Sequence, residues 1–375
     1  MNPITAFGVG CFHLAVRLKP PYRFRPSSYA EIIESLLGKL DTVGRFSVSP
    51  STMASSDELK LGDGALSMLH EGVWLPGYID AVEFSLRIPR RVQDDIVRAI
   101  HGKNYSWTGL GTEHFMVRTR YFYDAPVTIV ECLDLDDDEC EDPSDAVVVV
   151  REFLKQKLKE SEADIDLEVV GPSPFHADFF VFDETEEVRP HVEHTETGGY
   201  DRVIAYVPPH IRENHADWVL EWMGPKLSFY YHLKRINIWQ ARQWGDVNRA
   251  WHSLNEPAGS ETWAGRAKAL MKKRRAIASL VDGVLMFQAG MLSRRQRAYS
   301  AKENNRSERG LEFLDEKIDR TFEDTFRTYP TAQVLELAKF YETRDSKRRD
   351  RVHVLVAALM GGAIGAILSQ LLGGT

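Results

Sequence analysis

The feature that most constrains this sequence is an uncharged run near its C-terminal end. Residues 354–375 contain no Asp, Glu, Lys, Arg or His, and ten of the residues from Val352 to Leu372 are Leu, Ile or Val. At about 1.5 Å per residue, a helix over 354–372 reaches roughly 28 Å, which matches the hydrocarbon core of a bilayer. The sequence therefore predicts a single transmembrane helix at 352–372. A buried helix in a soluble oligomer is the alternative.

A group of basic residues, which we call the basic collar, comes directly before this run. It consists of Arg344, Lys347, Arg348, Arg349 and Arg351. Because excess Lys and Arg stay on the cytoplasmic side of a membrane, the residues before the span are expected to be cytoplasmic. This predicts a single-pass, tail-anchored membrane protein whose main partner is the lipid bilayer.

Small residues recur at every fourth position of the predicted span. They are Ala357, Gly361, Gly365 and Ser369. Small residues at this spacing form a ridge along which a second helix can approach closely in lipid. We therefore expect a homo-oligomer that associates through this ridge, although Gly and Ala are also common in membrane helices for other reasons.

Charge is divided unevenly along the chain. Residues 1–208 hold 20 Lys and Arg against 36 Asp and Glu, a net charge of −16, whereas residues 209–375 hold 27 against 19, a net of +8. An acidic domain joined to a basic helical part suits a protein whose basic part lies near an anionic membrane surface. Nucleic acid is an unlikely partner for the acidic part.

Residues 1–208 predict an α+β domain. Short alternating runs at 82–88, 113–124, 127–135, 167–170, 178–182 and 202–207 are typical of strands, and apolar periodicity at 28–40, 89–100 and 144–159 indicates helices. No glycine-rich phosphate loop and no G-x-S-x-G serine motif is present, so common nucleotide-binding and hydrolase folds are not supported. The three cysteines have no metal-binding spacing and are expected to be reduced thiols.

Two polar groups in this domain are candidate divalent-cation sites. Imidazoles and carboxylates together are plausible ligands for zinc or another transition metal, and the candidate residues are His176, Asp178, His191 and His194. The second group is the acidic run 134–142. Its spacing is similar to the start of a calcium loop, but Glu139 stands where that loop needs glycine. A solvated acidic loop is the alternative.

From residue 209 the periodicity becomes helical. Residues 209–330 predict a basic, aromatic-rich helical stem, either a bundle or an imperfect coiled coil, and 331–351 a stalk helix that carries the basic collar. The Gly224-Pro225 pair is expected to break or kink the first stem helix. The aromatic residues at three- and four-residue steps are expected to form its core.

In outline, such a domain, stem and membrane helix resembles the CorA-type magnesium channels. That family has two spans joined by a Gly-Met-Asn loop, whereas this sequence predicts one span, and its Gly290-Met291 pair is followed by Leu292. The resemblance is one of architecture, so no ion site is transferred. The functional prediction is a tail-anchored sensor or scaffold that self-associates through stem and span. A pore-forming or other membrane-acting effector is a specific form of this prediction. The alternatives are a membrane-tethered metal-dependent enzyme that uses His176, His191 and His194, and an ion-transport relative of the CorA type by architecture alone. The ligand is unknown.

Overall fold

The computed structural model describes residues 3–16, 23–24, 26–51, 59–60, 79–102, 105, 107–122, 125–134, 142–161, 165–169, 177–183, 190–197, 200–208, 214–255, 263–305 and 310–344. The chain divides into two compact units that interleave along the sequence. The first, the sheet unit, comprises residues 1–236 and 298–325, and the second, the helical unit, comprises 237–297 and 326–375. The division predicted above, at residues 208, 330 and 351, stays a prediction.

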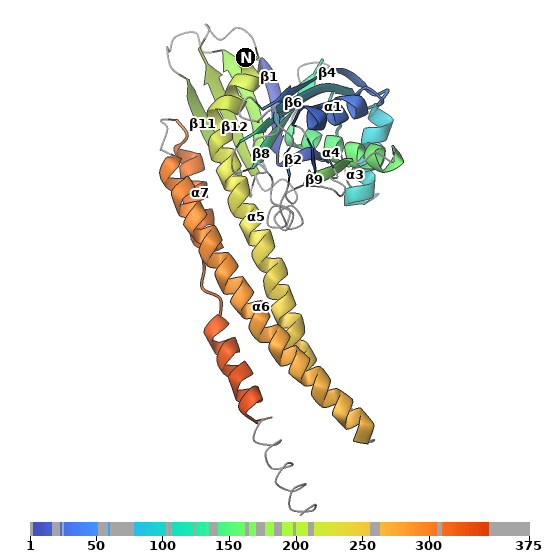
Figure 1. Ribbon diagram of the computed structural model, residues 1–375. Coiled ribbons are helices and arrows are strands. Elements are labelled where there is room, and N and C mark those ends of the chain that lie inside the picture. Colours follow the sequence, from blue (N-terminus) through green and yellow to red (C-terminus); the bar gives the residue numbers. More distant parts are fainter. Residues whose placement is uncertain are drawn as a thin grey trace, which may run out of the picture. The chain divides into compact units, whose positions relative to one another are not determined.

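The sheet unit is built on one eight-stranded sheet (Figure 1). Its spatial order is β11 (His191–Thr197), β12 (Tyr200–Val207), β10 (Ala177–Asp183), β1 (Thr5–Gly10), β8 (Pro126–Leu133), β7 (His114–Tyr121), β6 (Ile79–Arg87) and β4 (Val43–Pro50). Neighbouring strands are antiparallel except for the parallel pair β10–β12. Two short ladders accompany this sheet, β2 (Phe12–Val16) with β9 (Ile165–Val169) and β3 (Arg23–Phe24) with β5 (Leu59–Lys60).

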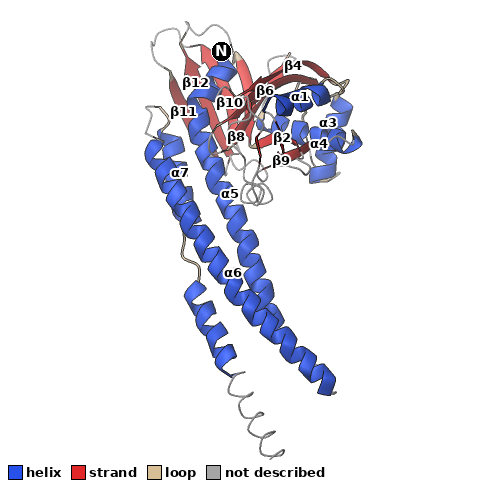
Figure 2. Ribbon diagram, in the orientation of Figure 1, coloured by secondary structure: helices blue, strands red, loops and turns tan. Residues whose placement is uncertain are grey.

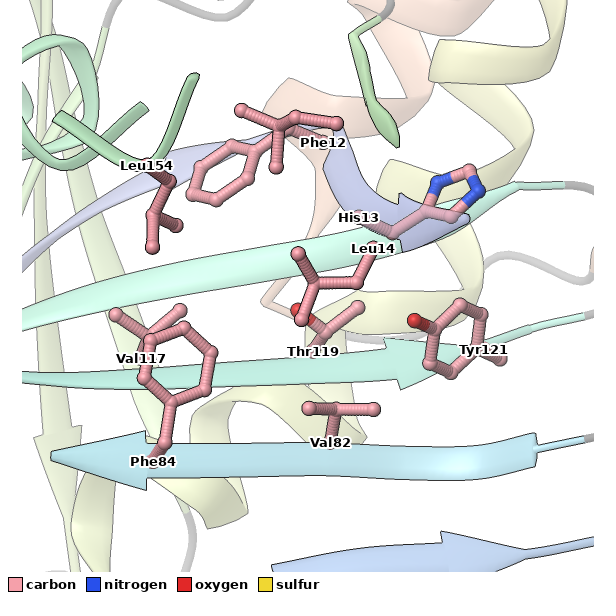
Figure 3. A pocket seen from close by; sticks show the side chains of 10 residues that line it. Phe12, His13, Leu14, Val82, Phe84, Val117, Thr119, Tyr121 and Leu154 are labelled. Carbon is pink, nitrogen blue, oxygen red and sulfur yellow. The ribbon is translucent and has the colours of Figure 1, made fainter. Parts of the chain in front are cut away.

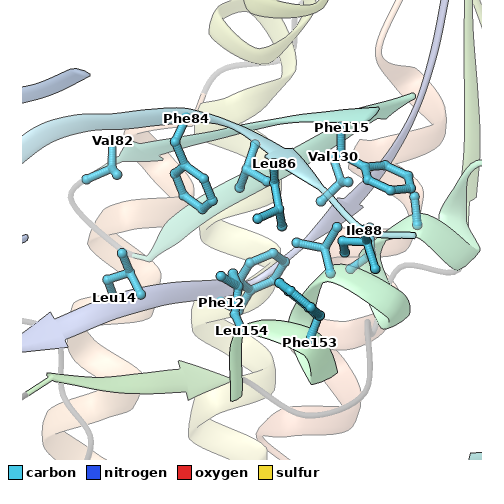
Figure 4. Close-up of a cluster of buried hydrophobic side chains, with 14 of the residues drawn as sticks. Phe12, Leu14, Val82, Phe84, Leu86, Ile88, Phe115, Val130, Phe153 and Leu154 are labelled. Carbon is cyan, nitrogen blue, oxygen red and sulfur yellow. The ribbon is translucent and has the colours of Figure 1, made fainter. Parts of the chain in front are cut away.

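Three helices cover one face of the sheet. They are α1 (Pro26–Leu37), α3 (Arg90–His101) and α4 (Ser144–Glu160). Figure 4 shows the apolar core on this face, where Phe84 and Phe115 from the sheet meet Phe153 and Leu154 from α4. Alternating side chains of β6 and β7 point into this core, as the period-two pattern of the sequence requires.

Two glycines in β1 allow α4 to lie very close to the sheet. A Cβ built on Gly8 would lie 2.7 Å from the carbonyl oxygen of Pro143 and 2.6 Å from a methyl group of Val147. A Cβ on Gly10 would lie 2.7 Å from Val147. Both distances are below normal contact, so any side chain at these positions pushes the helix away from the strand.

The other face of the sheet is more polar at its β6–β7 side and receives the start of α5 (His215–Asn255). Arg120 on β7 pairs with Glu83 on β6 at 2.7 Å and with Asp217 on α5 at 2.5 Å. The backbone N–H of Ala125 donates to Ser228 Oγ at 2.8 Å. The sheet unit therefore has helices on both faces, and it is completed by α7 (Glu312–Thr325), whose Lys317 pairs with Asp201 of β12.

The helical unit is a packed set of helical segments from three parts of the chain (Figure 2). They are the second half of α5, most of α6 (Trp263–Asn304), and the residues 331–344. The Trp239 ring stacks on Phe287 with centroids 5.7 Å apart, and the Arg294 guanidinium lies 3.7 Å from the centre of the Trp239 ring. Thus part of the aromatic set predicted to be core does pack between helices.

The large sheet with helices in the N-terminal part confirms the predicted mixture of strands and helices. Residues 191–197 form strand β11, which was not predicted. Helix α5 runs through Gly224-Pro225, so the predicted break is wrong, whereas the alternative of a kink stays a prediction. The predicted membrane helix 352–372 lies outside the described residues, and the coiled-coil stem stays a prediction.

Candidate functional site

The structure places the predicted metal ligands apart. Asp178 lies on β10, where its carboxylate accepts a hydrogen bond of 2.8 Å from the backbone N–H of Ser144 at the start of α4. Burial raises the pKa of Asp178, and the hydrogen bonds from Ser144 partly oppose that shift. His176 lies outside the described residues. Asp178 therefore holds the first turn of α4 on the sheet.

His191 and His194 point to opposite faces of β11. Successive side chains in a strand alternate, and these two positions differ by an odd number. The His191 ring stacks on Tyr206 with centroids 4.4 Å apart. His194 Nε2 lies 2.7 Å from Asp201 Oδ1. The two imidazoles cannot bind one ion from this strand, and none of the described residues form a group of three such side chains able to hold a metal.

His194 instead belongs to a polar cluster between β11, β12 and α7. Its ring stacks on Phe313 of α7 at 4.7 Å, and its partner Asp201 is 3% exposed. Lys317, also on α7, pairs with the second carboxylate oxygen of Asp201. Asp201 thus accepts hydrogen bonds from both His194 and Lys317. These contacts compensate its buried charge and fix α7 against the edge of the sheet.

The acidic run is described only at its two ends. Asp134 Oδ2 lies 3.1 Å from His114 Nδ1, and both side chains are exposed. Asp142 precedes α4, where it contributes to the raised pKa of Asp145, which is due first to burial. The carboxylates between them lie outside the described residues, so the calcium-loop hypothesis stays a prediction.

A cavity lies between the core face of the sheet and β2 (Figure 3). It is lined by Phe12, His13, Leu14, Val82, Phe84, Val117, Thr119, Tyr121, Leu154 and Leu167. The space that it leaves for the centre of a water-sized sphere is about 10 Å³, roughly what one water molecule needs and too little for an organic ligand. Most of the lining is apolar, so we interpret this cavity as a packing space of the core.

His13 is the main titratable group beside this cavity. It is 4% exposed, and its Nε2 lies 3.6 Å from Glu168 on β9. Burial and, second to it, the positive charge of Arg235 lower the pKa of His13 from 6.5 to about 3. Burial also raises the pKa of Glu168. His13 is therefore neutral at physiological pH, and the short distance to Glu168 is not a full ion pair.

The depressed pKa of His13 predicts a loss of stability on acidification. The unfolded chain binds a proton at His13 below pH 6.5, whereas the folded chain binds it only near pH 3, so stability falls as pH drops through this window. Between pH 7 and 5 the loss from His13 is about 2 kcal/mol. The raised pKa of Glu168 acts in the opposite direction, because it contributes stability at low pH.

Urea unfolding at pH 7 and pH 5 checks this prediction in the wild-type chain and in His13→Asn. Subtracting the two pH dependences removes the contributions of Glu168 and of the other carboxylates. The wild type should lose about 2 kcal/mol more than the variant over this interval. Equal losses in both chains would show that His13 is accessible to protons in the folded state.

In the helical unit, α6 combines length with an apolar sequence. Residues Met271–Asn304 form 34 residues of helix that are long and apolar enough to cross a membrane, and 22% of the most apolar window is buried. Among the described residues this helix passes that test, which rests on length and composition alone. It lies in the middle of the chain. Its most exposed apolar side chains are Met271, Leu285, Met286 and Leu292.

The residues predicted to act in the membrane lie almost wholly outside the described part of the chain. Arg344 is the one member of the basic collar that the structure describes, and it is exposed at the end of the helix 331–344. Lys347, Arg348, Arg349, Arg351 and the ridge of Ala357, Gly361, Gly365 and Ser369 fall beyond it.

Sequence reasoning missed the Asp201–Lys317 pair and the outward-facing row on α6. The first joins residues far apart in the sequence, so no local pattern announces it. The second belongs to the apolar positions of α6, and sequence periodicity alone did not show which of these positions are buried and which are exposed.

Comparison of this chain with protein-family models, curated proteins and solved structures finds no match.

Proposed function

We propose that this chain is a membrane-anchored scaffold or sensor, with the sheet unit in the cytoplasm and self-association through its helices. The observation that carries the proposal is that α6 is long and apolar enough to span a bilayer, while only 22% of its most apolar window is buried. Such a surface needs lipid or protein to cover it. The apolar residues 352–372 add a second segment of the same kind.

Of these two segments, 352–372 is the better membrane anchor. Val247 of α5 packs on Gly283 of α6, and Ala338 shares the core of the helical unit. Placing α6 in hydrocarbon would carry along exposed charges of the two helices packed on it, besides its own Asp282. These charges are Asp246 and Arg249 on α5 and Glu336 and Lys339 on the helix 331–344. Each such charge opposes insertion by about 2.5–3.5 kcal/mol near the centre of a span. Residues 352–372 contain no comparable group except His353 at their edge.

The basic collar gives the proposed anchor its orientation. Arg344 and the four basic residues that follow it before residue 352 would remain on the cytoplasmic side, together with the sheet unit. In this orientation the helical unit lies at the membrane surface, where basic residues of α6 such as Arg274 and Arg275 can meet anionic lipid headgroups. A pore-forming or other membrane-acting effector role is a specific form of this proposal. The alternatives of a metal-dependent enzyme and of ion transport gain no specific observation from the described residues.

Crosslinking in membranes tests self-association. Changing both Gly361 and Gly365 to leucine should widen the contact along the small-residue ridge. Crosslinked oligomer should fall by about tenfold, which corresponds to roughly 1.4 kcal/mol of association free energy. Ala363→Leu is the matched control, because residue 363 lies on nearly the opposite side of the helix. Oligomers that are equally abundant in all three chains would contradict association through this ridge.

A further inference from the structure

Helix α6 carries an outward-facing row of apolar side chains, separate from the side it buries in the helical unit. The row is Met271, Ala278, Leu285 and Leu292, at intervals of seven residues. Met271, Leu285 and Leu292 are 58%, 51% and 70% exposed. A seven-residue interval falls 20° short of two helical turns, so the four side chains form one stripe. A stripe with this period is typical of a helix that packs against another helix.

The opposite side of α6 is already covered within the helical unit. Ile277, Leu280 and Val284 are buried against α5 and the helix 331–344. The outward row is therefore not part of the core of this unit. Its polar neighbours Asp282 and Arg275 are exposed and lie beside the stripe. They remain at the edge of any helix that covers the row, where they can still reach water.

The helix 331–344 runs along α6 toward one end of this row. Gln288 donates a hydrogen bond of 2.8 Å to Thr331, and Lys273 lies 5.0 Å from the ring centre of Tyr341. Residue numbers rise along 331–344 while they fall along α6, so the two helices are antiparallel. Residue 344, the last that the structure describes, therefore lies toward the Met271 end of the row.

The lengths of the row and of the C-terminal segment agree. From Met271 to Leu292, and likewise from Val352 to Leu372, a helix extends about 30 Å. Residues 345–351 can extend to roughly 24 Å, which is enough to reverse the direction of the chain. The small residues Gly361 and Gly365 provide a groove into which leucine side chains of α6 can pack. A second copy packed in parallel through the same row would instead bring two Asp282 carboxylates together.

We infer that residues 352–372 cover the outward row of α6 before they enter a membrane. In this state the segment lies parallel to α6 and shields its own apolar surface together with Met271, Leu285 and Leu292. Entry into a bilayer then uncovers the row, which becomes available to a second copy. This inference rests on the proposed function, because it states where the proposed anchor lies before it enters a membrane.

Disulfide crosslinking of the full chain, made by cell-free synthesis without membranes, tests the inference. If Val352 lies beside Met271, Ala366 lies beside Leu285, since both are fourteen residues further along. The test chain therefore carries Leu285→Cys and Ala366→Cys, with Cys140→Ser to remove a native thiol, while Cys11 and Cys132 are buried. The matched control replaces Leu285→Cys with Ser279→Cys, which is exposed on the same helix about 120° away.

The expected result is an intramolecular disulfide that forms about tenfold faster in the test chain than in the control, because the segment is held at the row. Adding liposomes of anionic lipid should abolish the disulfide as the chain begins to float with them. Equal rates in the two chains, or a disulfide between two copies, would overturn the inference. Flotation without a prior disulfide would reject this covered state but not the proposed membrane anchor at 352–372. A disulfide that persists without flotation would support the covered state and reject the anchor.

Discussion

Replacing Gly8 with valine is expected to destabilise the sheet unit by about 3 kcal/mol or more, toward the upper end of the effects seen for overpacked cores. The Cβ alone would lie 2.7 Å from the backbone of both Pro143 and Ser144. These are backbone atoms at the start of α4, so no side-chain rotation relieves the contact. The helix has to move off β1, and that opens the core that Val147 and Val150 fill.

Gly245→Ala is the matched control for this prediction. Gly245 lies inside α5, and a Cβ there meets nothing within 4 Å. Alanine should stabilise the helix by about 0.8–1 kcal/mol, since glycine is the poorer helix former. Urea-unfolding midpoints should therefore shift in opposite directions in the two variants. A Gly8→Val chain with an unchanged midpoint would show that α4 does not lie on β1 as described.

Removing the carboxylate of Glu131 is expected to destabilise the sheet unit by about 3–5 kcal/mol, because it leaves a buried arginine without its main partner. Glu131 pairs with Arg118, and the two side chains are 13% and 9% exposed. Thr5 Oγ1 also donates to Glu131 at 2.6 Å, and Arg118 reaches Asn214 Oδ1 at 3.2 Å. Glu131→Ala would disrupt this whole network.

The double change of Glu131→Ala with Arg118→Met separates the two causes. If the loss arises from an uncompensated charge, the second change should restore much of the lost stability, because no buried charge then lacks its partner. Glu160→Ala serves as the surface control: its pair with Lys157 spans 2.9 Å on α4 with Glu160 64% exposed, so its loss should be below about 1 kcal/mol. Equal losses for Glu131→Ala and Glu160→Ala would contradict the buried network.

Local patterns in the sequence predict much of the sheet unit. The alternation of Val82, Phe84 and Leu86 with polar residues marks β6, and the apolar spacing of 144–159 marks α4. Neither pattern determines which strands are neighbours. The parallel β10–β12 pair and the position of β11 depend on pairings between distant residues, and β11 contains His, Glu and Thr in place of a recognisable apolar alternation.

The candidate site was less predictable than the fold. His191 and His194 resemble a metal-binding pair only when their backbone is taken as a helix or loop, and the strand places them on opposite faces. The continuity of α5 through Gly224-Pro225 likewise depends on contacts with residues that are distant in the sequence. Gly224 admits the ring of Phe122, whose nearest atom would be 2.2 Å from a Cβ, and the buried contacts on either side outweigh the helix-breaking tendency of Pro225.

Flotation of the chain synthesised in the presence of liposomes tests the central claim most directly. The claim is that residues 352–372, and not α6, hold this protein in the membrane. The full chain should float with the lipid and resist extraction at high pH, whereas a chain that ends at Arg351 should remain in the soluble fraction with its helical unit intact. A full chain that stays soluble, or a shortened chain that still floats and resists extraction, would contradict the claim.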